Sequence, residues 1–350
     1  MLAATAVLVS HAYPLALGEG TPEPLQKTLG FTLGSVAVWT FFSVSGYFIS
    51  QSFDRCESVF DFCAARFLRI YPGLFTVLVI TVVVIGPLTT SVDLASFFLN
   101  RSTYLYVPQN LTLKWLEYDL PGVFRNNPYQ SIINGSLWTL FYEVACYALA
   151  AIVGTVCVEW KSFGIFITIY VCGYLIFDFW GAQAYLTNSA TLRNLHEMSF
   201  PFVLGMVFFR FIDRNNFRLW VLLAVAAVAY FSYQTLWFSE CFILAWSYGV
   251  FYVGFRALPI WKEYNRVGDY SYGIYIYGFP VEQIVASIRT GCSALQLTAW
   301  ALPLTIACAV ISWRLVERPA LAQRRWVVCW GQAFLQRTLG WVPFRSGTRA

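Results

Sequence analysis

The sequence predicts an all-α, polytopic integral membrane protein with about ten transmembrane helices and both termini in the cytoplasm. Hydrophobic residues make up 58% of its 350 residues and charged residues 12%, whereas soluble domains have about 45–50% and about 25%. The mean hydropathy is +0.59, and apolar runs of about 20 residues recur along the chain. Because these runs do not alternate with a period of two, a large β-barrel is disfavoured.

Ten apolar segments are predicted to cross the membrane, each with approximate ends. The sixth, seventh and eighth are short, so two of them could merge or tilt unusually. In chain order the ten segments are 2–17, 31–53, 71–90, 137–158, 163–180, 199–212, 219–233, 241–256, 270–287 and 297–316.

Lysine and arginine are divided unevenly between the alternate loops. With the N-terminus inside, the inner loops and tails hold 17 of the 23 basic residues and the outer loops hold 6. This bias follows the positive-inside rule, and it predicts cytoplasmic termini and an even number of spans. The net charge of +5 then reflects topology and anionic lipid headgroups, and no nucleic-acid partner is expected.

The predicted outward segment 91–136 is too long to be a plain connector and too apolar for disorder. Its aromatic side chains stand among amides and carboxylates, a mixture that suits a sugar-binding cleft. A belt of Trp and Tyr on the lipid headgroups has the same composition, so both interpretations stay open. The aromatic residues include Tyr104, Tyr106, Trp115, Tyr118, Phe124 and Tyr129.

Two of the ionisable side chains inside predicted spans stand out, because the cost in free energy of placing such a group there suggests a function. His11 lies ten residues after Met1, which is about 15 Å along a helix and about half-way through a core of about 30 Å. An imidazole can accept a proton near physiological pH, although a hydrogen-bonded packing role explains His11 equally well. Glu143, near the predicted outer end of the fourth span, needs a hydrogen-bond partner, a water-filled cavity or a proton.

Arg66 and Arg69 are spaced i, i+3, so they share one face of a helix just before the third span. Two guanidinium groups on one face can each bind a phosphate group bidentately. Positive-inside membrane anchors have the same pattern, and the spacing does not distinguish the two roles. Pro72 is predicted to break the chain between an interfacial helix and the third span.

Two further segments carry polar groups in or beside predicted spans. In FFSVSGYFIS, Ser43, Ser45 and Gly46 allow two helices to approach closely, so packing is their simplest role. In GDYSYGIYIYGFPVEQ, five hydroxyl groups precede Glu282 and either line a polar cavity or anchor the helix at the interface. The nine cysteines show no metal-ligand spacing, and no metal is expected.

Taken in order, these landmarks resemble the membrane acyltransferase 3 family, the transmembrane O-acyltransferases of bacterial surface polysaccharides. The segment around His11 resembles the family's lAa-x-V-x-x-H segment, FFSVSGYFIS its FF-x-x-SG-[FY]-x-I segment, and RFLRIYP its R-x-x-R-x-[YF]-P motif. NGSLWTLFYEVACY resembles its LW[ST]L-x-x-E segment, with Glu143 as the acid. GDYSYGIYIYGFPV and SWRLVERPAL resemble its last two spans, including the closing E-[RK]-P. The likeness predicts an acyltransferase domain over 1–325 and a cytoplasmic tail over 326–350.

Two positions depart from the family's pattern. An arginine usually stands eleven residues before the histidine, which is the position just before Met1. Many relatives also have a histidine in the ninth span, where this chain has Gly278. The roles of those two residues therefore cannot be carried over to this sequence.

The resemblance implies that an acyl-CoA, most often acetyl-CoA, approaches from the cytoplasm. The acceptor is then a hydroxyl of an extracytoplasmic glycan or lipid-linked saccharide. His11 is expected to act as general base, with Glu143 orienting the imidazole or the acceptor. Arg66 and Arg69 are expected to bind the CoA phosphates.

The resemblance also implies a location and partners. The protein is expected in the bacterial inner membrane among membrane lipids, and the sequence leaves its oligomeric state open. Three aromatic residues inside the matched segments are expected to contact substrate: Tyr47, Trp138 and Tyr272.

Three alternatives stay open. The acyl group could pass through a covalent acyl-enzyme on a serine or tyrosine of a span. Intramembrane His and Glu also serve proton-coupled transporters and flippases, although the broken spans of an inverted repeat are not seen. The third alternative is an acyltransferase-like membrane protein without activity.

Overall fold

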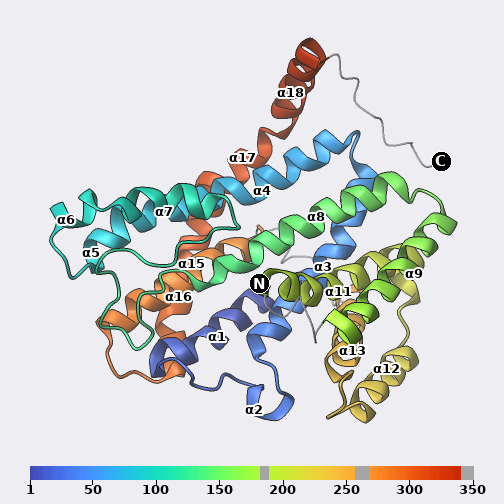
Figure 1. Cartoon of the computed structure of the whole chain (residues 1–350), viewed down its shortest axis with the longest axis horizontal. Coiled ribbons are helices and arrows are strands. Elements are labelled where there is room, and N and C mark those ends of the chain that lie inside the picture. The colour runs from blue at the N-terminus through green and yellow to red at the C-terminus, as the bar shows by residue number, and fades with distance from the viewer. Residues whose placement is uncertain (182–188, 257–267, 340–350) are drawn as a thin grey trace. The chain divides into compact units, whose positions relative to one another are not determined.

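The computed structural model describes residues 1–181, 189–256 and 268–339. In these ranges every element is a helix, apart from one isolated bridge between Thr90 and Val123 (Figure 1). The all-α prediction is therefore confirmed for the part of the chain that the structure describes.

Each of the ten predicted spans falls on a helix. Six helical stretches are long and apolar enough to cross a membrane, namely Leu33–Arg55, Val59–Thr89, Gly135–Val156, Trp160–Phe179, Phe238–Phe255 and Ala294–Ala322. Two apolar helices, Leu2–Leu17 and Leu219–Phe231, are shorter. The count of ten crossings and the orientation of the termini stay predictions.

The helices at the predicted spans have the following bounds. They are α1 Leu2–Leu17, α3 Leu33–Arg55, α4 Val59–Ile80, α8 Trp138–Val156, α9 Trp160–Ile176, α11 Ala190–Phe211, α12 Leu219–Phe231, α13 Phe238–Phe255, α15 Ser271–Ile288 and α16 Ala294–Ser312. The remaining α-helices are α2 Gln26–Leu29, α5 Gly86–Thr89, α6 Leu94–Leu99, α7 Arg101–Leu111, α17 Arg318–Ala322 and α18 Arg324–Leu339.

The predicted break at Pro72 is wrong. Pro72 lies inside α4, which runs on through a π-helical turn, Thr81–Ile85, into α5. A proline removes one backbone N–H from a helix, but membrane helices tolerate it where neighbouring groups satisfy the freed carbonyl. Arg66 and Arg69 are therefore part of the same helix as the third predicted span.

The chain divides into two compact units. Unit 1 comprises Met1–Val38, Ala64–Phe141 and Ile260–Cys329, and unit 2 comprises Trp39–Cys63, Tyr142–Pro259 and Trp330–Ala350. Exposed apolar side chains such as Ile169 on α9 and Leu223 on α12 fit helices that face lipid, because large exposed apolar surfaces are rare in soluble monomers.

In unit 1, α15 is the central helix. It packs against α1 and α16 (Figure 1), and 14 of its 18 residues are buried, on all sides of the helix. Helices apolar or buried all round lie in the interior of a bundle. Gly273 makes the approach of α16 close, because a Cβ at this position would lie 2.8 Å from the Cα of Ala309.

The segment 91–136 belongs to unit 1 and has both buried and exposed aromatic side chains. Tyr106 and Phe124 are 1% and 2% exposed, whereas Tyr104 and Trp115 are 64% and 71% exposed. The segment is closed at one end, where Ser91 N–H donates to the carbonyl of Gly122 at 3.0 Å. Tyr106 and Phe124 are therefore buried, while Tyr104 and Trp115 are open to the surroundings.

In unit 2, α3 and α11 approach each other at two glycines. A Cβ on Gly46 would lie 1.9 Å from the carbonyl oxygen of Phe202, and one on Gly205 would lie 2.0 Å from that of Ser43. No side chain fits such gaps. The prediction that the FFSVSGYFIS segment serves close helix packing is confirmed.

Candidate active site

His11 lies on α1 in unit 1, half-buried, with Leu8, Ala12 and Leu15 buried around it. Its imidazole meets the ring of Phe279 from α15 in an edge-on arrangement, with 5.2 Å between the ring centroids and 71° between the planes. The contact holds one side of the imidazole against α15.

The residue before His11 ties α1 to the segment that follows it. Ser10 is fully buried; its Oγ accepts a hydrogen bond from Gly34 N–H at 2.8 Å, and its hydroxyl donates to the carboxylate of Glu23. Burial raises the pKa of Glu23 above 4.5, against the opposing effect of hydrogen bonds from Ser10 and Thr32.

Tyr129, from segment 91–136, lies on Phe279 as well, with 6.2 Å between the ring centroids. Burial raises the pKa of the Tyr129 phenol, and the negative charges of Glu19 and Glu23 raise it further. Two carboxylates therefore lie near the phenol of Tyr129, whose ring contacts Phe279. Such groups can hydrogen-bond to hydroxyls, as a saccharide would require.

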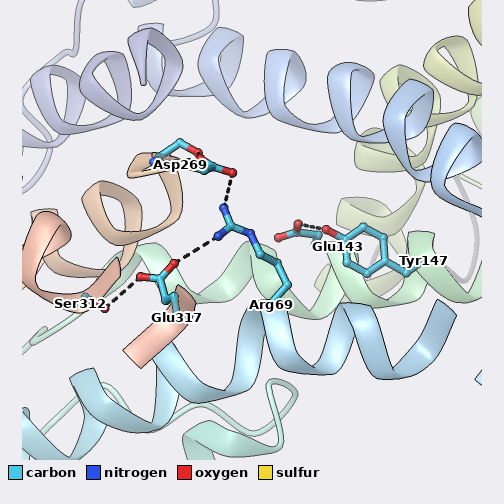
Figure 2. A network of polar contacts seen from close by, with 7 residues as sticks. Arg69, Glu143, Tyr147, Asp269, Ser312 and Glu317 are labelled. Atoms are coloured by element: carbon cyan, nitrogen blue, oxygen red, sulfur yellow. Dashed lines mark hydrogen bonds and ion pairs between the residues drawn. The ribbon is translucent and has the colours of Figure 1, made fainter. Parts of the chain in front are cut away.

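Arg69 is the centre of a second polar cluster in unit 1 (Figure 2). Its Nη2 lies 2.6 Å from Asp269 Oδ2, and its Nη1 lies 3.2 Å from Glu317 Oε2. The Glu317 side chain is 1% exposed and also accepts a hydrogen bond from Ser312 at 2.9 Å. The guanidinium is thus held between two carboxylates.

Tyr272 belongs to the Arg69 cluster. The guanidinium carbon of Arg69 lies 5.5 Å from the ring centroids of both Tyr272 and Trp313, within cation–π range. The Tyr272 hydroxyl donates to the carbonyl of Ile70 at 2.7 Å. Arg66 lies on the same helix as Arg69, half-buried.

Glu143 lies on α8 in unit 2. The hydroxyl of Tyr147, one turn further along the same helix, donates to its carboxylate (Figure 2). This is the kind of partner that a carboxylate inside a span requires. The predicted pairing of Glu143 with His11 joins the two units and stays a prediction.

The other two predicted substrate residues, Tyr47 and Trp138, lie in different units. Tyr47 is buried in an aromatic cluster of unit 2, with 5.1 Å between its ring centroid and that of Phe251. Trp138 is the first residue of α8 and is half-buried in unit 1. Their roles in substrate binding stay predictions.

The comparisons with known proteins agree with the sequence motifs. A family model described as an acyltransferase domain matches residues 1–315. The chain belongs to the membrane acyltransferase 3 family. It is therefore an acyltransferase, and it is 30% identical over 337 residues to an O-acetyl transferase of Shigella phage Sf6, covering 92% of this chain and 94% of that protein.

This acyltransferase is also 26% identical over 350 residues to nodulation protein 10 of Rhizobium leguminosarum bv. viciae, covering 93% of this chain and 92% of that protein. No solved structure matches it. The likeness to an O-acetyl transferase supports an O-acetyl-transferring enzyme.

Two of the acyltransferase's motifs meet in unit 1. Arg69, from the R-x-x-R-x-[YF]-P motif, pairs with Glu317, from the closing E-[RK]-P, although 248 positions separate them. The motifs alone did not show that one supplies the counter-ion of the other.

Sequence reasoning missed three features: two residues near the unit 1 sites and the contacts of the second histidine. Glu23 carried no motif, although it follows soon after the first span. Phe279 looked like one more apolar residue of a span, and no local pattern shows that it contacts His11. The other histidine, His196 of unit 2, is stacked between Tyr174 and Phe177, at 3.7 Å and 4.2 Å between centroids.

Proposed function

We propose that this acyltransferase moves an acetyl group from acetyl-CoA, or another acyl group from its CoA thioester, to a hydroxyl of an extracytoplasmic glycan or glycolipid. The single observation that carries the proposal is the place of His11 in a chain of this family, inside an apolar helix of unit 1 with its ring edge-on to Phe279. Only two histidines occur in the whole sequence. The other, His196 of unit 2, is stacked between Tyr174 and Phe177.

His11 acts as general base in this proposal. One ring nitrogen takes the proton of the acceptor hydroxyl while the hydroxyl oxygen attacks the thioester carbonyl carbon. The new C–O bond forms and the C–S bond breaks. The imidazolium then gives its proton to the departing thiolate, so that free CoA thiol leaves and His11 returns to its neutral form.

The donor is proposed to enter from the end of unit 1 that carries Arg66 and Arg69, which the charge bias predicts to be cytoplasmic. Arg66 and Arg69 would contact the CoA phosphates. Arg69 already has two carboxylate partners, so a phosphate would have to share or displace Asp269, the more exposed of them.

The acceptor is proposed to approach from the side of Glu23 and Tyr129, which belong to segments predicted to be extracytoplasmic. Their carboxylate and phenol groups suit saccharide hydroxyls. The names of the two relatives give no acceptor for this chain, and the acceptor class rests on the family resemblance. A multi-pass location in the bacterial inner membrane is part of the same proposal.

The test compares the two histidines. The full chain is purified in detergent and supplied with labelled acetyl-CoA and a panel of de-O-acetylated bacterial lipopolysaccharides, and label transfer and CoA thiol release are both measured. His11→Ala should lower kcat by about 10² to 10⁴, the range of general base catalysis. His196→Gln serves as the control, and it should keep kcat.

Two outcomes would contradict the proposal. Full activity of a folded His11→Ala variant would exclude His11 as the base. Loss of activity in His196→Gln alone would move the base to the His196–Asp178 pair, whose Nε2–Oδ1 distance is 3.4 Å. The transporter alternative would replace this proposal if acetyl-CoA is not consumed and proteoliposomes that contain the protein instead carry a glycan across the membrane together with protons.

A further inference from the structure

α15 contains a proline, Pro280, that removes one backbone hydrogen bond from the helix. Pro280 has no N–H, so the carbonyl of Ile276, four residues earlier, lacks its usual helical donor. Asn134 supplies the missing donor from another segment: its Nδ2 lies 2.8 Å from the Ile276 oxygen. Both groups are buried, and an unsatisfied buried carbonyl costs about 1–3 kcal/mol.

The same asparagine begins α8. Its Oδ1 accepts the N–H of Ser136 at 3.2 Å and caps the 3₁₀ turn Gly135–Leu137 that leads into the helix. Asn134 therefore uses its acceptor on its own segment and its donor on α15. An aspartate would keep the first of these bonds and lose the second.

The next residue, Gly135, lies directly against Phe279. A Cβ on Gly135 would be 2.6 Å from Cε2 of the Phe279 ring, a distance that real Cβ atoms do not reach. Tyr129 contacts the same ring, and His11 meets it at 5.2 Å. Phe279 is thus enclosed by the turn, by Tyr129 and by the imidazole.

A second set of bonds fastens the same segment to α15 near Phe279. Asn127 Nδ2 donates to the backbone and side-chain oxygens of Gln283 at 2.9 Å and 2.7 Å. Gln283 Nε2 donates in return to the carbonyls of Tyr129 and Ile132 at 2.9 Å and 2.6 Å. The segment is therefore held on both sides of Phe279 along α15.

We propose that the turn Asn134–Gly135 is a positioning element for the general base: it fixes Phe279, and through Phe279 it fixes the imidazole of His11. The inference rests on the proposed role of His11. Misplacing a catalytic group by about 1 Å can cost about 10² in rate, so a turn that holds the ring beside His11 acts on kcat. Donor binding, at the Arg66 and Arg69 end, is left unchanged.

The first test compares two isosteric substitutions, Asn134→Asp and Asn110→Asp. Asn134→Asp should lower kcat by about 10- to 100-fold, with the KM for acetyl-CoA within about twofold of the wild-type value. Asn110→Asp is the matched control, because Asn110 is also buried in segment 91–136 and donates to the carbonyls of Tyr106 and Glu117 at 2.8 Å and 3.0 Å. It should lower the melting temperature by a similar amount and leave kcat unchanged.

The second test separates repair of the helix from positioning. Pro280→Ala restores the backbone N–H that Ile276 lacks, and it is combined with Asn134→Ala and also measured alone. We expect the double variant to recover the melting temperature lost in Asn134→Ala but not its kcat. Recovery of both would mean that Asn134 only satisfies a carbonyl, and the inference would be wrong.

Failure of the inference and failure of the proposed function look different. If His11→Ala is inactive while Asn134→Asp keeps kcat, His11 remains the base and the turn is merely structural. If His11→Ala is fully active, the inference falls together with the proposed function. Gly135→Ala adds an independent check, because its methyl group presses on Phe279 without touching the Asn134 bonds, and it should also lower kcat.

Discussion

Arg69 and Glu317 form a buried ion pair across 248 positions of the chain, with 3.2 Å between Nη1 and Oε2. The Arg69 side chain is 19% exposed and that of Glu317 is 1% exposed. Removing one member of such a pair leaves an uncompensated buried charge, which costs about 3–5 kcal/mol. Loss of activity in a single Arg69 variant therefore does not by itself reveal a role in donor binding.

Arg69→Ala should destabilise the protein by about 3–5 kcal/mol. The double variant Arg69→Met with Glu317→Met should recover most of that loss, because two apolar side chains replace the pair. Thermal unfolding in detergent measures both effects. In the stable double variant, a raised KM for acetyl-CoA would support phosphate binding by Arg69, and an unchanged KM would leave Arg69 a structural anchor.

Glu282 and Gln283 are adjacent, fully buried residues of α15 with opposite hydrogen-bonding states. Neither carboxylate oxygen of Glu282 has a hydrogen-bond partner among the residues that the structure describes, whereas Gln283 is held by the bonds to segment 91–136. Glu282→Met should raise stability by about 1–3 kcal/mol, the cost of an unsatisfied buried polar group.

Gln283→Met is the control for Glu282→Met, and it should lower stability because it leaves Asn127 and two backbone carbonyls without their partner. Melting temperatures of the two variants should move in opposite directions. A lower melting temperature for Glu282→Met would show that the carboxyl group has a stabilising partner.

Glu23 should make stability fall as the pH rises from acid to neutral. Its pKa is raised above 4.5 by burial, so the folded protein binds the proton more tightly than the unfolded chain does. The resulting stabilisation is complete below about pH 4.5 and is lost as the pH rises through the folded-state pKa. The melting temperature of wild type minus that of Glu23→Gln should decrease over this range and then level off. A difference that grows with pH would contradict the raised pKa.

Gly46 and Gly173 offer a matched pair in unit 2. Gly46→Ala should strongly destabilise the protein, because its Cβ would lie 1.9 Å from a backbone oxygen of α11, and backbone shifts from overpacking cost about 1–3 kcal/mol or more. Gly173→Ala, on α9 with nothing within 4 Å of the new Cβ, should stabilise the helix by about 0.5–1 kcal/mol. Equal melting temperatures for the two variants would disprove the close contact of α3 and α11.

Much of the helical framework was predictable because hydrophobicity and helix length are local properties. The helix at the first predicted span has the predicted ends, since α1 runs from Leu2 to Leu17. The sixth predicted segment, 199–212, is shorter than the helix found there, Ala190–Phe211. Polar residues such as His196 precede the apolar run but belong to the same helix. Pro72 was taken as a break because the rule for isolated helices ignores neighbours that satisfy the freed carbonyl.

The candidate site was predictable only as a set of residues. The rarity of histidine and its place in an apolar run singled out His11, and the motifs singled out Arg69, Glu143 and the closing E-[RK]-P. The contacts between them depend on packing. Phe279 lies 268 positions after His11, and the counter-ion of Arg69 lies in the last motif.

The sequence by itself therefore determined the class of this protein, most of its helices and a set of candidate site residues, because hydrophobic runs and family motifs are local features of the chain. Only the tertiary structure decided which of those residues act together. It assigned Tyr272 to the Arg69 cluster and made Asn134 the donor that Pro280 removes from α15. The physical reason is that a buried polar group takes whichever partner the packed helices bring to it, whatever its distance along the chain.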